Sequence, residues 1–394
     1  MRTYEESHPW INFRLDVRRL PWQIWLMLGE AESKCQHVAG VPLKPGVAMR
    51  LNQIYLSKGI HGTTSIEGNT LSEDEVLALV QGADLGLPKS REYQAREVEN
   101  ILAAYNSIQE DVVKGRPLEL TPERIKHFNL MVLDGLETED WVVPGECRTR
   151  SVGVLNYRGA PAEDCEHLLD QMCIWLGSKE FHADGEERDE RLRFTMVTLK
   201  AILAHLYIAW IHPFGDGNGR TARLIEFQLL VQAGLPMPAA HLLSDHYNLT
   251  RDRYYLELQK TSRKPYDLTD FIGYALQGFI DGLRDQLGHI REQQMQVTWE
   301  NYVHDQFHET TPSRTRQKHL VLDLPEDGTP VPRSKLTNLS PRLAVAYNDK
   351  GSKTLTRDLN ALLGRNLVRR AKGGIVANRE IIRAFLPLAA EQNQ

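Results

Sequence analysis

Between two apolar segments with helical spacing, 194–211 and 221–234, the chain reads Ile211-His-Pro-Phe-Gly-Asp-Gly-Asn-Gly-Arg-Thr-Ala-Arg223. The first helix is expected to end at His212, because a residue that precedes proline disfavours the helical conformation. The glycines let the backbone turn tightly and approach a ligand, and the helix that follows offers unpaired N–H groups and its positive dipole end to an anion. The segment therefore predicts a phosphate-binding loop between two core helices.

The polar side chains of this loop are those of a nucleotide site that uses a metal ion. Arg220 and Arg223 lie three residues apart, so both are expected on one face of the first helical turns, where two cations can hold a polyphosphate. Asp216 is a hard oxygen ligand of the kind that holds Mg²⁺ together with phosphate oxygens and water. Histidine titrates near neutrality, which suits His212 to take a proton from an incoming hydroxyl. Each of these residues, taken alone, could instead be a helix cap, a turn residue or a member of a surface ion pair. Their occurrence together in one short segment is what predicts the site.

The loop HPFGDGNGR, followed by Arg223, resembles the signature HPFx(D/E)GN(G/K)RxxR of the Fic family. The resemblance implies a mainly α-helical Fic core with a β-hairpin flap. It also implies protein adenylylation, in which AMP moves from ATP to a Ser, Thr or Tyr hydroxyl of a target protein. On this resemblance His212 is the general base and Asp216 binds Mg²⁺. The ATP phosphates would be held by Gly217, Asn218 and Gly219 (α and β), by Arg220 (β) and by Arg223 (γ).

A second resemblance lies upstream, at Thr63-Thr64-Ser65-Ile66-Glu67-Gly68-Asn69, which is similar to the inhibitory motif (S/T)xxxE(G/N) of Fic proteins. A glutamate at a helix end can pair with Arg223 and take the place of the γ phosphate. The resemblance implies self-inhibition through Glu67, in the subgroup whose inhibitory helix precedes the core. The alternative for the heptamer alone is a helix end with Glu67 in solvent. The resemblance also implies an alternative function for a protein with this glutamate, the reverse reaction, in which AMP is removed from the target.

Two further segments are candidates for target and adenine binding. Residues 142–161 mix β-formers with turn formers, which predicts a hairpin; by the resemblance it is a flap that holds an extended target segment, with Val154 and Leu155 as candidate contacts. Tyr254 and Tyr255 follow the loop at the spacing where relatives place aromatic residues against adenine, and core packing is the alternative for each. His205 also matches the family pattern, but on an apolar helix it is expected to be a hydrogen-bonded core residue.

The composition indicates a soluble globular protein of two or three domains. The chain has 394 residues, of which 41% are hydrophobic and 25% charged. We expect four parts: an N-terminal helical segment with the inhibitory motif (1–115), the catalytic core (116–290), a connecting helix or linker (291–311) and a C-terminal domain (312–394).

The C-terminal domain is expected to carry a net positive charge, and the rest of the chain a net negative charge. Residues 312–383 hold 15 Lys and Arg against 6 Asp and Glu, a net charge of +9, so the other residues carry −5 − 9 = −14. The order of helix, turn, helix and hairpin resembles a winged helix-turn-helix domain, and candidate DNA contacts are Lys353, Arg357, Arg369, Arg370 and Lys372. A protein partner or a second copy of the chain is the alternative ligand. An ATP-sensing DNA-binding regulator is the alternative for the whole protein.

Several other classes of protein are not indicated. The start of the chain is polar and acidic, without the basic and apolar regions of a signal peptide, and the four cysteines lack the spacing of a zinc site. The segment 194–211 is interrupted by Lys200 and His205, so we expect a core helix and no membrane partner. A cytoplasmic protein with free thiols is expected. Its partners would be ATP, Mg²⁺ and a target protein, with self-modification and a homodimer left open.

Overall fold

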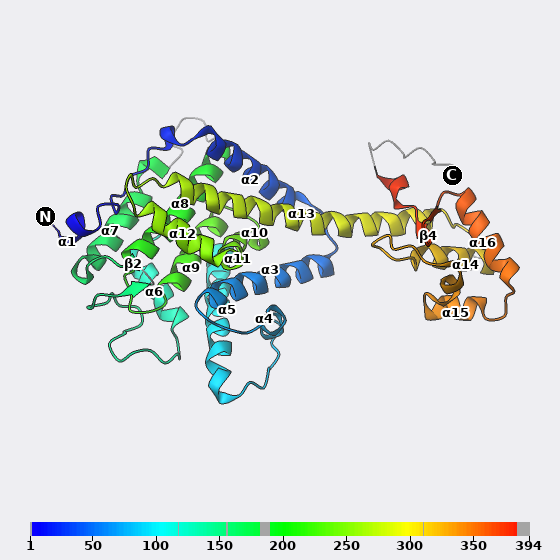
Figure 1. Cartoon of the computed structure of the whole chain (residues 1–394), viewed down its shortest axis with the longest axis horizontal. Helices are drawn as coiled ribbons and strands as arrows, with labels where there is room; N and C mark the ends of the chain where they lie inside the picture. Colours follow the sequence, from blue (N-terminus) through cyan, green and yellow to red (C-terminus); the bar gives the residue numbers. More distant parts are fainter. Residues whose placement is uncertain (1, 117, 155–156, 182–189, 310, 384–394) are drawn as a thin grey trace. The chain divides into compact units, whose positions relative to one another are not determined.

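The computed structural model describes residues 2–116, 118–154, 157–181, 190–309 and 311–383 (Figure 1). Helices predominate among them, and the chain divides into two compact units, Met1–Leu287 and Gly288–Gln394. Each unit has a hydrophobic core of its own. Helices from both sides of residue 115 share the first core, so the N-terminal segment and the catalytic core form one unit.

The first unit consists of helices and one short hairpin. In chain order its α-helices and strands are α1 (Thr3–Ser7), α2 (Trp22–Gly40), α3 (Pro45–Ile66), α4 (Glu73–Val80), α5 (Glu92–Val113), α6 (Pro122–Val132), β1 (Gly153–Val154), β2 (Tyr157–Arg158), α7 (Cys165–Leu176), α8 (Glu190–Ile211), α9 (Asn218–Gln232), α10 (Met237–Ala240), α11 (Leu242–Leu249), α12 (Arg251–Thr261) and the first half of α13 (Thr269–Asp305).

Helices α8 and α9 pack against each other in the first core (Figure 1). A helix that is apolar on all sides belongs inside a protein or in a membrane. Leu192–Ile211 is long and apolar enough to span a membrane by composition, yet 78% of its most apolar window is buried inside this unit. In α9 the residues from Arg220 to Val231 are all buried. The prediction of a core helix over 194–211 is confirmed, and both flanks of the polar loop are thereby fixed.

Helix α3 approaches His241 and α11 closely because it has glycines, Gly59 and Gly62, at the points of contact. A Cβ at Gly59 would lie 2.7 Å from Nδ1 of His241, and a Cβ at Gly62 would lie 2.7 Å from the carbonyl oxygen of Ser244. Any larger side chain at these positions would push the helices apart. This packing holds the C-terminal end of α3 beside α9.

The hairpin is shorter than the predicted 142–161. Gly153 pairs with Arg158 and Val154 with Tyr157, in antiparallel register. Residues before β1 form turns instead, because Gly145 adopts a left-handed conformation with φ of 81°. Leu155 and the side chain of Val154 lie outside the described residues, so their predicted contact with a target segment stays a prediction.

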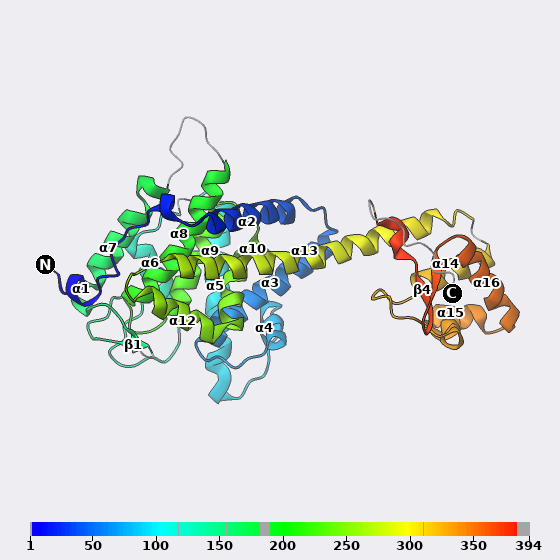
Figure 2. The ribbon, with the colours of Figure 1, turned by 45° about the horizontal axis from the view of Figure 1, so that its top comes forward.

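The second unit comprises the end of α13 and the elements after it (Figure 2). They are α14 (Pro312–Leu322), η5 (Arg333–Asn338), α15 (Pro341–Tyr347), α16 (Ser352–Gly364), β3 (Val368–Ala371), β4 (Gly374–Ala377) and η6 (Arg379–Ile382). Strands β3 and β4 pair antiparallel, and Val331 adds a single bridge to Ile375. The predicted connection over 291–311 is helical as far as Asp305. It belongs to the second unit, since Trp299, Val303 and Phe307 are buried in that core.

Candidate active site

The loop before α9 is closed by its own side chains. Asn218 accepts a hydrogen bond at Oδ1 from the N–H of Phe214 and donates one from Nδ2 to the Phe214 carbonyl, each over 2.9 Å. Gly217 has φ of 75°, and a Cβ there would lie 2.9 Å from Nδ2 of Asn129. The side chain of Asn218 therefore shapes the loop. The first turn of α9 keeps backbone N–H groups that have no acceptor within the helix, as an anion site requires.

Asn129 of α6 joins the loop to the segment before the hairpin, a role that the sequence did not reveal. Its side chain is fully buried and donates from Nδ2 to the carbonyl of Asp216 over 2.9 Å. Its Oδ1 accepts from the N–H of Gly145 over 3.0 Å. One amide thus satisfies two backbone groups that lie far apart in the chain, and in the sequence it is only a polar residue on an amphipathic helix.

His212 has left-handed backbone dihedrals and is held by Arg148. The φ of His212 is 50°, and its carbonyl accepts a hydrogen bond from Nε of Arg148 over 2.7 Å. Arg148 is itself only 4% exposed and also donates to the carbonyls of Arg150 and Ala160. Burial, followed by the positive charge of Arg148, lowers the pKa of His212 from 6.5 to about 4. The imidazole is therefore neutral near pH 7 and able to accept a proton.

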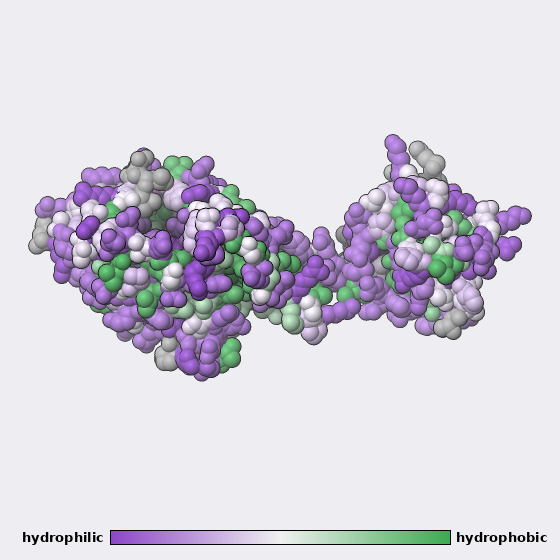
Figure 3. All heavy atoms as spheres, turned by 90° about the horizontal axis from the view of Figure 1, so that it is seen from below, coloured by the Kyte–Doolittle hydropathy of each residue, from purple (hydrophilic) through white to green (hydrophobic). Residues whose placement is uncertain are grey.

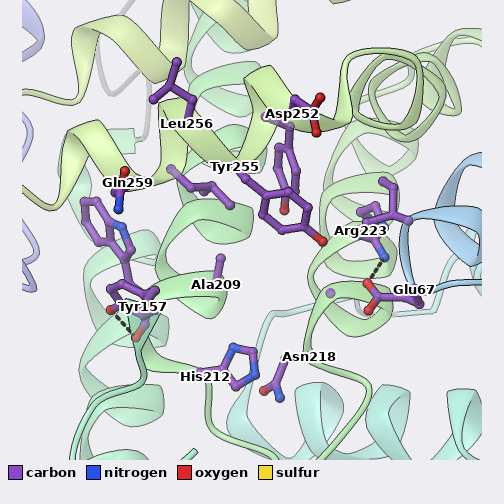
Figure 4. Close-up of a pocket in the computed structure, with 15 residues that line it drawn as sticks. Glu67, Tyr157, Ala209, His212, Asn218, Arg223, Asp252, Tyr255, Leu256 and Gln259 are labelled. Carbon is purple, nitrogen blue, oxygen red and sulfur yellow. Dashed lines mark hydrogen bonds and ion pairs between the residues drawn. The ribbon is translucent and has the colours of Figure 1, made fainter. Parts of the chain in front are cut away.

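A cavity of about 340 Å³ opens beside His212 (Figure 4). That volume falls within the roughly 300–1,000 Å³ that is usual for small-molecule pockets. His212 and Asn218 lie on one side of it, Glu67 and Arg223 on another, and Tyr255 reaches toward it from α12. With Gly219 and Tyr254, which also line the cavity, seven residues predicted as site residues from the sequence lie around one space.

Arg223 is buried and takes its partners from α3. Its Nη2 lies 2.6 Å from Oε1 of Glu67, its Nε donates to the Thr63 hydroxyl over 2.6 Å, and Nη2 also donates to the Thr63 carbonyl over 3.0 Å. Burial would raise the pKa of Glu67, but the charges of Arg223 and Arg220 outweigh it and hold that pKa below its ordinary value. The pairing of Glu67 with Arg223 that the heptamer predicted is present.

Arg220 has different partners and lines a different cavity. Nη1 lies 2.8 Å from Oε1 of Glu97 in α5, and Nη2 lies 3.2 Å from Oδ1 of Asp216. Asn69 donates to the other oxygen of Glu97 over 2.9 Å. Arg220, Asp216 and Glu97 line a second, larger cavity of about 1270 Å³ that does not include Arg223. The two arginines, predicted on one helical face, are therefore drawn apart by carboxylates from two different helices.

The two tyrosines of α12 differ in their surroundings. Tyr254 is 3% exposed, and its hydroxyl lies 2.9 Å from Nε2 of His205. His205 also contacts Glu226 through Nδ1 over 3.2 Å and is fully buried, which confirms its expected role in the core. Tyr255 is half-buried and lines the 340 Å³ cavity, with the guanidinium of Arg251 6.0 Å from its ring centre. Tyr254 thus combines core packing with a place in the cavity wall.

Sequence reasoning missed most of the remaining cavity wall. The missed residues are Tyr157, Ala209, Trp210, Asp252, Leu256, Leu258 and Gln259. For α12 a signal was present, because Asp252, Tyr255 and Gln259 recur at the three- and four-residue spacing of one helical face. For Tyr157 none was present, since its place depends on the hydrogen bond of its hydroxyl to the carbonyl of Trp210 over 2.7 Å.

Residues 119–230 match the Fic/DOC family, and this segment holds both the loop and Asn129. This central segment of the chain is similar to the Fic/DOC family. The chain is a distant relative of curated adenylyltransferases. Protein adenylyltransferase fic-1 of Caenorhabditis briggsae is 26% identical over 59% of this chain and 42% of its own length, and the Drosophila virilis Fic adenylyltransferase is 31% identical over 46% of this chain and 33% of its own. This chain therefore spans well under half the length of these relatives.

Solved structures show that the fold is the Fic fold. A Fic family protein from Desulfovibrio desulfuricans superposes with a TM-score of 0.52 at 19% identity, covering 88% of this chain and 92% of that one. A fragment of Fic-1 from Caenorhabditis elegans gives a TM-score of 0.52 at 21% identity, covering 68% of this chain and 73% of the fragment. The chain is thus mainly α-helical, with a small two-stranded antiparallel sheet near its C-terminus.

Proposed function

We propose that this protein is an adenylyltransferase that moves AMP from ATP to a Ser, Thr or Tyr hydroxyl of a target protein, and that Glu67 inhibits it at rest. The observation that carries the proposal is the composition of the 340 Å³ cavity. Its wall combines a neutral imidazole (His212), the first turn of a helix with free N–H groups, and a buried guanidinium (Arg223) that is already paired with a carboxylate.

The proposed chemistry needs one base and little else from the protein. The target hydroxyl attacks the α phosphorus of ATP, so a new P–O bond forms while the bond between the α phosphorus and the bridging oxygen breaks and pyrophosphate leaves. His212 takes the hydroxyl proton during the attack and later releases it to solvent. The rest of the catalysis is positioning and charge stabilisation, as is usual for transfer reactions at phosphorus.

The residues present fit a magnesium–nucleotide complex. No group of three or more His, Cys, Asp or Glu residues that could hold a metal occurs in the part of the chain that the structure describes. A nucleotide-bound Mg²⁺ needs only one or two carboxylates, because phosphate oxygens and water supply the other ligands. Asp216, whose side chain is 49% exposed, would be that ligand. When bound, the ion would neutralise charge on the phosphates.

The proposed inhibition is a competition for one position. A Cβ at Gly219 would collide with Oε1 of Glu67, so the carboxylate lies directly over the first turn of α9. A phosphate held by that turn and by Arg223 would need the same space and the same guanidinium. Glu67 therefore substitutes for an anionic group of the nucleotide.

The test follows label from ATP into protein. The wild-type protein and the variants Glu67→Gly and Glu67→Gly/His212→Ala are incubated with Mg²⁺, a cell lysate, and ATP labelled at either the α or the γ phosphate. We expect protein-bound label only from α-labelled ATP, strongest with Glu67→Gly and absent with the double variant. Protein-bound label from γ-labelled ATP would show that the protein transfers a phosphoryl group and not AMP. If no label appears but the wild type releases AMP from a pre-adenylylated lysate, removal of AMP is the activity.

A further inference from the structure

Helix α16 in the second unit presents a polar face that the proposed transferase chemistry does not use. Along this helix Lys353, Thr356, Arg357 and Asn360 recur at intervals of three and four residues, and each is exposed or half-exposed. The opposite face is buried, through Leu355, Leu359 and Leu362 among others. The outer face therefore consists of two cations and two hydrogen-bonding side chains in one continuous row.

The only carboxylate within α16 points inward. Asp358 is 2% exposed and accepts hydrogen bonds from Nε of Arg316 over 2.7 Å, from Nε2 of Gln317 over 2.9 Å and from the hydroxyl of Tyr347 over 2.9 Å. This arrangement has two consequences. It ties α14, α15 and α16 together at one point, and it leaves the outer face of α16 without negative charge.

Arg333 lies next to this face, and further cations lie on the β3–β4 hairpin. Arg333 of η5 donates a hydrogen bond to the Thr356 hydroxyl, so η5 is fixed beside the exposed row. The turn between β3 and β4 packs against the segment that leads into η5, because a Cβ at Gly374 would collide with the carbonyl of Val331. On this hairpin Arg369 faces Glu380 at 3.7 Å, whereas no carboxylate of the described residues forms an ion pair with Arg370 or Lys372.

We propose that the second unit binds duplex DNA, with α16 in the major groove and the β3–β4 hairpin along the phosphate backbone. The order of α14, the Val331 bridge, α15, α16 and the hairpin matches that of winged helix-turn-helix domains. At about 1.5 Å per residue, the 13 residues of α16 extend about 20 Å, enough to lie along a major groove that is roughly 12 Å wide.

The chemistry of the face favours DNA over a protein or an RNA helix. Protein interfaces concentrate aromatic and aliphatic side chains, and Val345 on α15 is the only large hydrophobic residue that is exposed among the described residues of this unit. The visible face of the second unit in Figure 3 is mainly hydrophilic. A double-helical RNA has a deep, narrow major groove that excludes a helix. Lys and Arg reach phosphates, and Arg and Asn also pair with base edges.

The first test measures binding of the full chain to a fluorescent DNA duplex of mixed sequence over a range of salt concentrations. We expect log K to fall linearly with log salt, and Lys353→Ala/Arg357→Ala to reduce that slope by about 2, because each lost phosphate contact accounts for about 0.9. The charge-conserving variant Lys353→Arg/Arg357→Lys should keep the slope, and Arg369→Ala should change it less than the double variant. Thermal unfolding checks that all variants are folded.

The second test asks whether α16 contacts base edges. Selection from a pool of random duplexes should enrich a common sequence with the wild type, and Asn360→Ala should lose preference at one position while still binding. Three results would overturn the proposal: no binding to duplex at low salt, equal salt slopes for the wild type and Lys353→Ala/Arg357→Ala, or tighter binding to RNA than to duplex DNA. Failure of AMP transfer would not affect these outcomes, because they depend only on the second unit.

Discussion

Nη2 of Arg223 lies 2.6 Å from Oε1 of Glu67, and Thr63, four residues before Glu67, supplies a hydroxyl and a carbonyl to the same guanidinium. Helix α3 and its C-cap residue thus supply three acceptors to a buried cation on α9. Removing one partner of a buried pair leaves a charge that is costly to expose to an apolar interior. A nucleotide phosphate is a chemically equivalent replacement for Glu67. Under the proposed function, Arg223 would stay paired with Glu67 at rest and exchange it for a phosphate of the nucleotide.

Thr63 should contribute to inhibition through its hydroxyl. Thr63→Val leaves Nε of Arg223 without its partner, which costs about 1–3 kcal/mol, and this weakens the inhibited arrangement. We expect basal AMP transfer to rise by at least about fivefold, though less than in Glu67→Gly. Thr64→Val is the matched control, because Thr64 is equally buried but its hydroxyl donates only to carbonyls of its own helix. Equal rates for the two variants, measured with α-labelled ATP, would contradict this role.

His212 should act in the chemical step and not in ATP binding. His212→Ala in the Glu67→Gly background is expected to lower the rate of AMP transfer by about 10²–10⁴, the usual contribution of a general base. The dissociation constant for ATP, measured by titration calorimetry, should stay within about threefold, because the anion-binding turn and Arg223 are unchanged. A normal rate in this variant would remove His212 from the mechanism.

The rate of AMP transfer should not fall near neutral pH through protonation of His212. Burial lowers the pKa of His212 to about 4, so in the folded protein the base stays neutral where an ordinary histidine would be protonated. The fraction of protein molecules in which His212 is neutral, and can accept a proton, falls only as the pH falls through about 4. Glu67 raises the pKa of His212, so Glu67→Gly should not shift this fall to higher pH. Transfer by this variant, at saturating ATP, should stay nearly level from about pH 7.5 to about pH 5.5. A midpoint near 6.5 would show an ordinary, solvated histidine.

Asn129 should be required for the shape of the loop. Asn129→Ala leaves the carbonyl of Asp216 and the N–H of Gly145 unpaired, which should cost about 1–3 kcal/mol of the free energy of unfolding and also lower AMP transfer. Asn100→Ala is the control, because Asn100 is a buried amide whose bonds go to the carbonyls of Val132 and Asp134, away from the loop. Urea denaturation should show both losses in stability. Only the Asn129 variant should lose activity at a temperature where both remain folded.

The features that could be predicted from the sequence are those formed by residues contiguous in the chain. The catalytic loop, the glutamate of the heptamer and the two apolar core helices are contiguous patterns, so they could be found without a structure. Arg148 and Asn129 could not be found in this way, because their roles come from carbonyls and N–H groups that tertiary packing brings to them. The hairpin is shorter than the mixture of β-forming and turn-forming residues over 142–161 predicts, because only Gly153 and Val154 find strand partners among the described residues of this segment.

The different partners of Arg220 and Arg223 have the same origin. Helical spacing places the two residues three apart, but the direction of a long side chain depends on the charges that surround it. Glu97 of α5 holds one guanidinium and Glu67, just after α3, holds the other. The heptamer predicted the partner of Arg223, but Glu97 belongs to no motif, so only the fold could reveal that Arg220 has a different partner.

The proposed inhibition of the transferase by Glu67 is tested most directly by the intact mass of the purified protein. The wild type, Glu67→Gly and Glu67→Gly/His212→Ala are each incubated with ATP and Mg²⁺ and weighed by mass spectrometry. We expect whole AMP units to be added to the Glu67→Gly protein alone. If Glu67→Gly gains no AMP either on itself or on proteins of a lysate, or if the variant without His212 gains as much, the claim is contradicted.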